Sequence, residues 1–302
     1  MNRTTMRPLG LFVALCLVVT SSVCHAWGYA AHRLINGAAV TDLPPDMRGV
    51  VIQQQAALAE HGPDPDLWKA DPAERSRHFI DLELGDRTGP PFSHLPRDYA
   101  GAVRALGADS VKKMGTLPWQ IQAYFDKLVR SMRRPSDSTW VIMAALGHYV
   151  ADAHMPMHAT INYDGQLTGN RGIHFRFEWW MLDPHLGEIK TALAPYVPFW
   201  AYDPLDVAWR ILLASYADID TLLAADTAAR TTFRPPIDAP DGRRQPDPQY
   251  DERLWARLGG IAERRMDMSA QAVAGYWYAA WLKAGRPDLR RAPAPPPPPP
   301  EE

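Results

Sequence analysis

Apolar residues recur at intervals of three and four along most of this chain, which is the spacing of amphipathic helices. The pattern predicts helices over residues 34–59, with a break at Pro44-Pro45, and over 99–114, 116–134, 139–154, 173–182, 206–224 and 251–284. We find no strand-rich region and no internal repeat. The expected fold is therefore all-α, a single-domain multi-helix bundle with long ordered loops.

Turn-forming residues mark where these helices stop. Residues 62–96 are rich in Pro, Gly and Asp and predict a long ordered loop region, and 164–172 and 235–248 predict two shorter loops. Thr116 and Ser138 are the expected helix caps, with Pro118 in a first turn and Pro156 after a last one. Residues 291–302 carry a proline run and are expected to form a disordered tail.

Residues 1–26 have the layout of a secretory signal peptide. Arg3 and Arg7 precede an apolar stretch over 9–20, and Ala26 is a small residue suited to cleavage. We expect a functional domain over 27–290 and a periplasmic or secreted location. Both cysteines lie in the leader, so the processed chain is expected to hold no disulfide. No later apolar run reaches the length of about 20 residues that spans a membrane.

The charge balance excludes a basic nucleic-acid coat but not an enzyme that acts on nucleic acid. The full chain has 32 basic and 34 acidic residues. Removal of Arg3 and Arg7 with the leader changes the formal net charge from −2 to −4. A protein that neutralises many phosphates carries the opposite sign.

Cleavage after Ala26 would make Trp27 the N-terminal residue. Its free α-amino group and carbonyl oxygen could together chelate a metal ion, and His32 follows five residues later. An N-terminal tryptophan is otherwise an unusual choice, so this spacing makes Trp27 and His32 candidate ligands.

Several further histidines have carboxylates at ligand spacing. His148 and Asp152 lie four residues apart on a predicted helix, and so do His174 and Glu178, which puts each pair on one helix face. His158 follows the first pair just beyond Pro156. A third cluster includes His78, with Asp64 and Asp66 upstream and Phe79 and Asp81 immediately after.

Zinc is the natural metal for imidazole and carboxylate ligands without thiolates. Five histidines, a free terminus and three carboxylates exceed the needs of one tetrahedral ion, so we expect a cluster of two or three. Clustered zinc ions lower the pKa of a bridging water and stabilise the attacking and leaving oxygens of a phosphate ester.

As an ordered set, these residues resemble the S1/P1 nuclease and zinc-dependent phospholipase C superfamily. The resemblance covers residues 27–180 by motif and implies an all-helical fold with three zinc ions. One ion would be held by an aspartate near 64 with His78, His148 and Asp152, and a second by His158, His174 and Glu178. The third would be held by Trp27, His32 and a bridging Asp152.

The first aspartate has two candidates. Asp64 lies 14 residues before His78, close to the family spacing, and Asp66 is the alternative. The resemblance implies that this carboxylate orients or deprotonates the attacking hydroxide. Family nucleases also have a basic residue three positions later, which is Leu67 after Asp64 but Lys69 after Asp66. We therefore keep Lys69 as a candidate catalytic residue.

Two substrate classes remain open. The segment from His78 to Asp81 resembles the nuclease base site, in which Phe79 would stack a base and Asp81 would bind its edge. Glu178 and the short loop before His174 fit the phospholipase branch, but its choline-site positions are Ala30, Pro65 and Arg75 here. We favour a nuclease that acts on single-stranded DNA or RNA and leaves 5′-phosphates. The alternatives are a phospholipase C-type enzyme and a non-catalytic zinc-binding periplasmic protein. No protein partner and no stable membrane insertion are implied.

Overall fold

The computed structural model describes residues 27–68, 70–192, 203–230 and 249–300, and within them every regular element is a helix. The longer helices are α1 (Tyr29–Asp42), α8 (Leu117–Arg133), α9 (Asp137–Ala153), α12 (Pro204–Tyr216), α13 (Ile219–Arg230) and α14 (Tyr250–Lys283). Shorter ones are α2 (Pro45–Val51), α3 (Gln55–Glu60), α4 (Asp64–Leu67), α5 (Leu82–Gly85), α6 (Tyr99–Leu106), α7 (Ala108–Met114), α10 (Ile173–Phe175) and α11 (Leu186–Ala192). Single turns are η1 (Ile52–Gln54), η2 (Glu74–Arg77), η3 (Pro156–Ala159), the π-helical η4 (Arg176–Met181), η5 (Asp183–His185) and η6 (Leu289–Arg291). The all-α expectation is confirmed for these residues.

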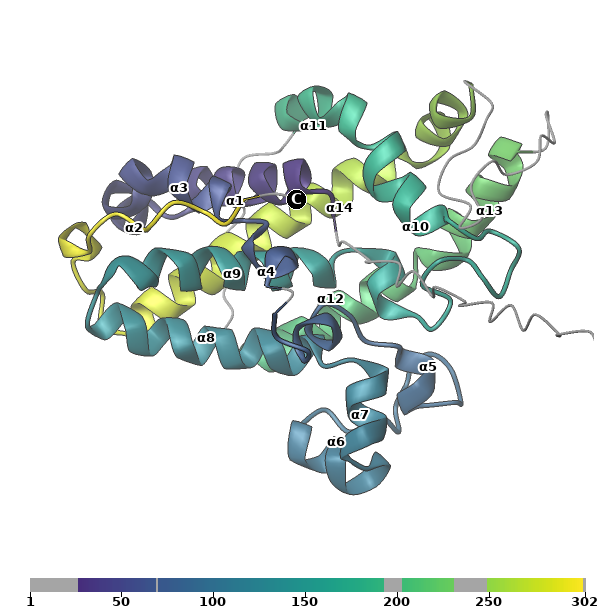
Figure 1. The fold of residues 1–302 in the computed structure, drawn as a ribbon, viewed down its shortest axis with the longest axis horizontal. Helices are drawn as coiled ribbons and strands as arrows, with labels where there is room; N and C mark the ends of the chain where they lie inside the picture. The colour runs from purple at the N-terminus through teal and green to yellow at the C-terminus, as the bar shows by residue number, and fades with distance from the viewer. Residues whose placement is uncertain (1–26, 69, 193–202, 231–248, 301–302) are drawn as a thin grey trace, which may run out of the picture.

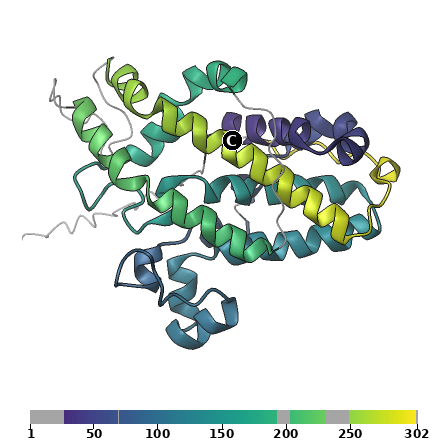
Figure 2. The same cartoon turned by 180° about the vertical axis from the view of Figure 1, so that it is seen from behind.

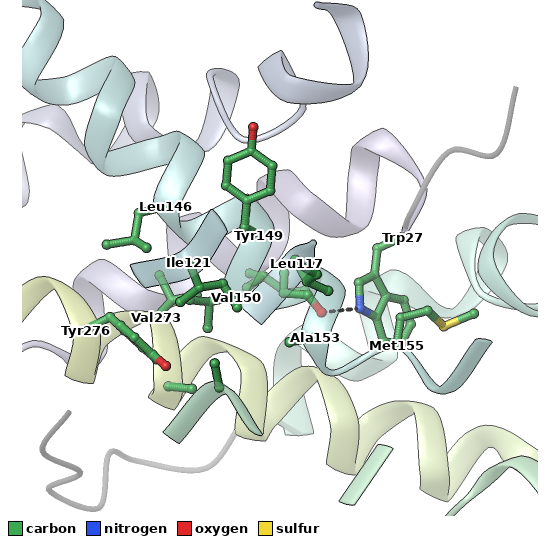
Figure 3. Close-up of a cluster of buried hydrophobic side chains, with 14 of the residues drawn as sticks. Trp27, Leu117, Ile121, Leu146, Tyr149, Val150, Ala153, Met155, Val273 and Tyr276 are labelled. Carbon is green, nitrogen blue, oxygen red and sulfur yellow. Dashed lines mark hydrogen bonds between the residues drawn. The ribbon is translucent and has the colours of Figure 1, made fainter. Parts of the chain in front are cut away.

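Helix α9 lies at the centre of the bundle and packs against α8, α14 and α1 (Figures 1 and 2). Nearly all of its residues from Thr139 onward are buried, because most of them are apolar and other helices pack around it. Figure 3 shows side chains from α8, α9 and α14, such as Ile121, Val150 and Val273, meeting in this core. Each large apolar side chain buried there contributes roughly 1.5–3 kcal/mol to stability.

A close approach of α1 to α9 sets the position of the N-terminal segment. A methyl group at Gly147 would collide with Asn36 of α1 and with Trp277, so glycine allows the two helices to touch. The Asn36 amide donates to the carbonyls of Leu58 and Ala144, which ties α1 to α3 and α9. One turn before Asn36 stands His32, which is thereby brought against α9.

Several predicted helix ends differ from the observed ones. The helix expected over 99–114 is divided into α6 and α7 at Gly107, whose φ of 84° is a left-handed conformation. The cap of α9 is Ser136 rather than Ser138, and its backbone N–H donates to the Thr139 hydroxyl. Most of the loop region over 62–96 is ordered, with α4, η2 and α5 inside it.

The proline-rich segment also differs from the expectation of disorder. After η6, which contacts α2, residues up to 300 run back along the body (Figure 1). Their backbone carbonyls accept hydrogen bonds from Trp140 and His61, which lie far away in sequence. A composition rule could not include those long-range contacts.

In the part of the chain described here, no helix is both long and apolar enough to cross a membrane. The leader over 1–26, and with it the expected cleavage, lies outside the described residues.

Candidate metal centre

Helix α9 provides the two central side chains of the site. His148 and Asp152 are both fully buried, and the 3.3 Å between His148 Nε2 and Asp152 Oδ2 confirms that they share one face. The other ring nitrogen, Nδ1, donates to the Gly62 carbonyl at 2.9 Å. That bond fixes the ring so that the lone pair of Nε2 points into the cluster, which is the arrangement of a metal-binding histidine.

His78 reaches the same point from the segment after η2. Its Nδ1 lies 3.0 Å from Asp152 Oδ2 and 3.1 Å from His148 Nε2. The segment is fixed on both sides, because Thr116 N–H donates to Ser76 and Ile80 N–H donates to His158. The structure thus brings three residues from two distant segments within ligand distance of one point.

Asp66, and not Asp64, faces these histidines. Asp66 Oδ1 lies 3.6 Å from His78 Nδ1 and 3.7 Å from His148 Nε2. Asp64 instead lies 2.6 Å from His61 Nδ1 through its Oδ2. Both aspartates lie on the single turn of α4. Because they are two residues apart, they point to different sides of that turn, and Asp66 is the one on the side of the histidines. We therefore replace Asp64 by Asp66 as the first candidate ligand. Lys69 lies outside the described residues.

His32 completes this side of the cluster. Its ring stacks on that of His148 with 3.9 Å between centroids, and its Nε2 lies 3.4 Å from Asp152 Oδ1. Trp27, just before α1, is fully buried and its indole donates to the Ala151 carbonyl at 2.9 Å (Figure 3). The side chain of Trp27 therefore anchors the start of the domain beside α9, one residue from Asp152.

A second group lies next to the first. His174 Nε2 is 2.8 Å from Glu178 Oε1, and His158 Nε2 is 3.6 Å from the same oxygen. His174 comes from α10 and Glu178 from the π-helical turn η4, a helix type that occurs often at functional sites. His158 Nδ1 donates to the His78 carbonyl at 2.6 Å, so its Nε2 is the nitrogen presented to the group.

Burial controls the protonation of the outer members of both groups. It lowers the pKa of His32 to about 4 and that of His158 to about 3, so both rings are neutral at pH 7, as metal ligands must be. It raises the pKa of Asp66 to about 6 and that of Glu178 to about 7. A cation held nearby would favour the ionised form of both carboxylates.

The centre of the cluster behaves differently. Burial opposes the charged form of His78, but hydrogen bonds to Asp152 and Glu74 raise its pKa to about 10. Burial alone would raise the pKa of Asp152, yet the neighbouring histidines hold it well below its usual value. In this arrangement a proton on His78 compensates the buried carboxylates, and a metal ion bound by His78 would have to displace that proton.

The donor set fits metal ions. Asp66 Oδ2 is buried and has no hydrogen-bond partner among the described residues, as is also true of Asp64 Oδ1. Asp152 Oδ1 forms no hydrogen bond there either, although His32 Nε2 lies 3.4 Å away. Buried carboxylate oxygens without a partner are costly unless a cation coordinates them. Three groups have ligand atoms within 4.8 Å of one another, namely His32–Asp66–His148, His78–His148–Asp152 and His158–His174–Glu178. Imidazole and carboxylate without thiolate suit zinc.

Glu74 is a site residue that the sequence reasoning missed. Its Oε1 accepts from the Tyr149 hydroxyl at 2.5 Å and lies 3.3 Å from His78 Nε2. Its Oε2 accepts from Arg77. Glu74 thus orients His78 from behind, as carboxylates do for metal-bound histidines. The signal was present, because Glu74 and His78 have the same four-residue spacing as the other pairs.

The two candidate substrate residues lie in the irregular segment between His78 and α5. Phe79 is half-buried, and its carbonyl packs against Gly115 and accepts from Leu117 N–H at 3.2 Å. Asp81 is buried, and burial together with Glu83 raises its pKa to about 8. Its carboxyl group is therefore mostly neutral at pH 7, which makes it a hydrogen-bond donor as well as an acceptor.

Comparison with known proteins adds no family assignment. No model of a protein family matches this sequence, and a search of curated proteins finds no significant match. The evidence for a function therefore comes from the residues of the site and their geometry.

Proposed function

We propose that this protein is an exported zinc-dependent phosphodiesterase, and specifically a nuclease of the S1/P1 type that acts on single-stranded nucleic acid. One observation carries the proposal. Histidines and carboxylates that are distant in sequence meet in adjoining buried groups. They come from α1, α4, α9, η3, α10, η4 and the segment after η2, in the order that the resemblance requires.

The ligands would divide among three zinc ions. Asp66, His78, His148 and Asp152 would hold one, and His158, His174 and Glu178 a second. Trp27 through its amine and carbonyl, His32 and a shared Asp152 would hold the third. When bound, clustered zinc ions make water nucleophilic near neutral pH and stabilise negative charge on phosphate oxygens.

The protein's own groups would do the remaining work. Asp66 Oδ2 would orient the attacking water and accept its proton, since this oxygen has no partner among the described residues. Glu74 would keep His78 in one orientation through the Tyr149–Glu74 hydrogen bond. Phe79 would stack on a base and Asp81 would bind the base edge, which favours strands whose bases are already unpaired.

Product analysis tests the proposal and its alternatives together. The processed protein is incubated with single-stranded DNA, duplex DNA, RNA and phosphatidylcholine, with an Asp66→Asn variant as the matched control. We expect 5′-phosphate products from single strands and little turnover by the variant. Lipid hydrolysis without nucleotide release would support the phospholipase C-type alternative instead. Full zinc occupancy without turnover of any substrate, bis(p-nitrophenyl) phosphate included, would indicate a non-catalytic zinc-binding protein.

A further inference from the structure

The prolines of the C-terminal segment over 293–300 offer the rest of the protein only hydrogen-bond acceptors, and Ala294 alone among these residues has a backbone N–H. Proline has no backbone N–H, so the carbonyls of a proline run cannot be paired within the run. Ala292 is buried, Pro295 and Pro299 are half-buried, and the other residues from 293 to 300 are exposed. One edge of the segment therefore lies against the body.

Two donors from the body bind that edge. The indole of Trp140 donates to the Pro293 carbonyl at 2.9 Å, and His61 Nε2 donates to the Pro296 carbonyl at 2.9 Å. The two carbonyls are three residues apart, which is one turn of a polyproline II helix, so they point to the same side. Domains that bind proline-rich peptides likewise use aromatic side chains to dock a polyproline II helix.

Both donor side chains are buried in the folded protein with the proline segment in place. Trp140 is 1% exposed and belongs to α9. His61 is 2% exposed and its second nitrogen is bonded to Asp64, so its ring cannot rotate freely. Side chains that are held in one orientation lose little conformational freedom on binding, which favours a defined binding site.

His61 also connects this surface to the metal centre. The next residue, Gly62, accepts the hydrogen bond from His148 Nδ1 that orients this candidate ligand. Four residues beyond Gly62 stands Asp66. A contact that holds His61 therefore also limits the movement of the Gly62–Asp66 segment, which carries one candidate ligand and positions another.

We propose that His61 and Trp140 form a binding site for a polyproline II helix, that the chain's own residues 293–300 are its resident ligand, and that occupancy fixes the segment from Gly62 to Asp66. The site differs from the metal centre, and its existence does not depend on any hydrolytic activity.

The test uses a chain that ends at Ala292 and a synthetic peptide of the sequence Pro-Ala-Pro-Pro-Pro-Pro-Pro-Pro added in trans. We expect the shortened chain to bind the peptide with a change in tryptophan fluorescence that Trp140→Phe abolishes, and the full chain not to bind it. In the shortened chain, His61→Ala should weaken binding by about tenfold, the effect of one buried hydrogen bond. A Gly-Ser peptide of equal length is the negative control. Equal binding to the full and shortened chains, or to neither, would overturn the proposal.

Amide hydrogen exchange in the full chain provides a second test that does not need the truncation to fold. Trp140→Phe should speed exchange at Gly62 and Asp64, although the hydrogen bond that it removes is one from the indole to the proline segment. Trp277→Phe is the matched control, because Trp277 also donates its indole N–H to a backbone carbonyl, that of Met143 in the same helix. Equal exchange in both variants would mean that the proline segment does not hold this loop.

Discussion

The imidazole rings of His32 and His148 are stacked, with planes 16° from parallel, and both face the carboxylate of Asp152. His32 lies 3.4 Å from Oδ1 and His148 lies 3.3 Å from Oδ2. One carboxylate thus faces two histidines from different helices through different oxygens. This is the geometry expected of a ligand shared by two metal ions.

Replacing Asp152 should therefore affect two ions at once. Asp152→Asn keeps the shape of the side chain but removes the charge, and we expect the zinc content to fall by about two ions per chain, since the second group keeps its own ligands. Elemental analysis of the purified variant measures this. Asp42→Asn, a change to another buried aspartate outside the site, should leave the content unchanged. Unaltered zinc in Asp152→Asn would rule out the shared-ligand role.

The two aspartates of α4 should respond differently. Asp66→Asn removes a candidate ligand that faces His78 and His148, so zinc affinity should fall by more than the roughly 10- to 100-fold lost when a residue behind a metal ligand is replaced. Asp64→Asn changes only the partner of His61, and affinity should stay within about threefold, because a neutral hydrogen bond can replace the lost one. Competition with a chelator of known affinity gives both values. The opposite ranking would return the ligand role to Asp64.

An additional residue in front of Trp27 should displace one zinc ion. The α-amino group would then become a peptide nitrogen, which has almost no basicity and cannot bind a cation. We expect one ion fewer per chain in this variant and a large loss of phosphodiesterase activity. Zinc content and activity equal to those of the correctly processed protein would refute a terminal ligand.

Two aspartates should contribute to the pH dependence of thermal stability with opposite sign. Burial raises the pKa of Asp81 from 3.8 to about 8, so its contribution is fully present below pH 3.8 and is lost as pH rises through 8. The Tm of Asp81→Asn should therefore increase relative to wild type between pH 4 and 8. A difference in Tm that does not change with pH would contradict the raised pKa.

Asp86 provides the opposite case. Hydrogen bonds from the Thr88 hydroxyl and from backbone N–H groups lower its pKa to about 2, so its stabilising contribution is present above pH 3.8 and is lost as pH falls through 2. Asp86→Asn should thus lower the Tm at neutral pH, with a difference that shrinks in acid. Both variants are melted at the same zinc concentration as the wild type.

Local sequence patterns predicted the parts of the site that lie on one helix. The four-residue spacing was sufficient for His148 with Asp152 and for His174 with Glu178, because helix geometry alone brings such pairs together. The spacing could not distinguish Asp64 from Asp66 as the ligand, because both sit on one short turn. In the structure Asp64 is hydrogen-bonded to His61 and so does not face the cluster.

Contacts between distant segments account for the remaining differences. The four-residue spacing between Glu74 and His78 was visible in the sequence, but the hydrogen bond from Tyr149 that holds Glu74 in place comes from another helix and was not. The proline segment was expected to be disordered, because its composition contains no information about Trp140 or His61. The predicted helix ends were wrong where a single glycine such as Gly107 takes a left-handed conformation and interrupts the helix. The spacing of apolar residues cannot detect such an interruption.

The metal content of the processed, full-length protein tests the central claim most directly. Elemental analysis after purification without chelator should find about three zinc ions per chain, the number that the nine candidate ligands can hold at three or four donors each. Exhaustive dialysis against a strong chelator should remove the metal and lower the Tm together, because metal that binds only the folded state stabilises it. A chain that is fully folded, contains less than about one ion and melts at the same temperature with and without chelator would contradict the account.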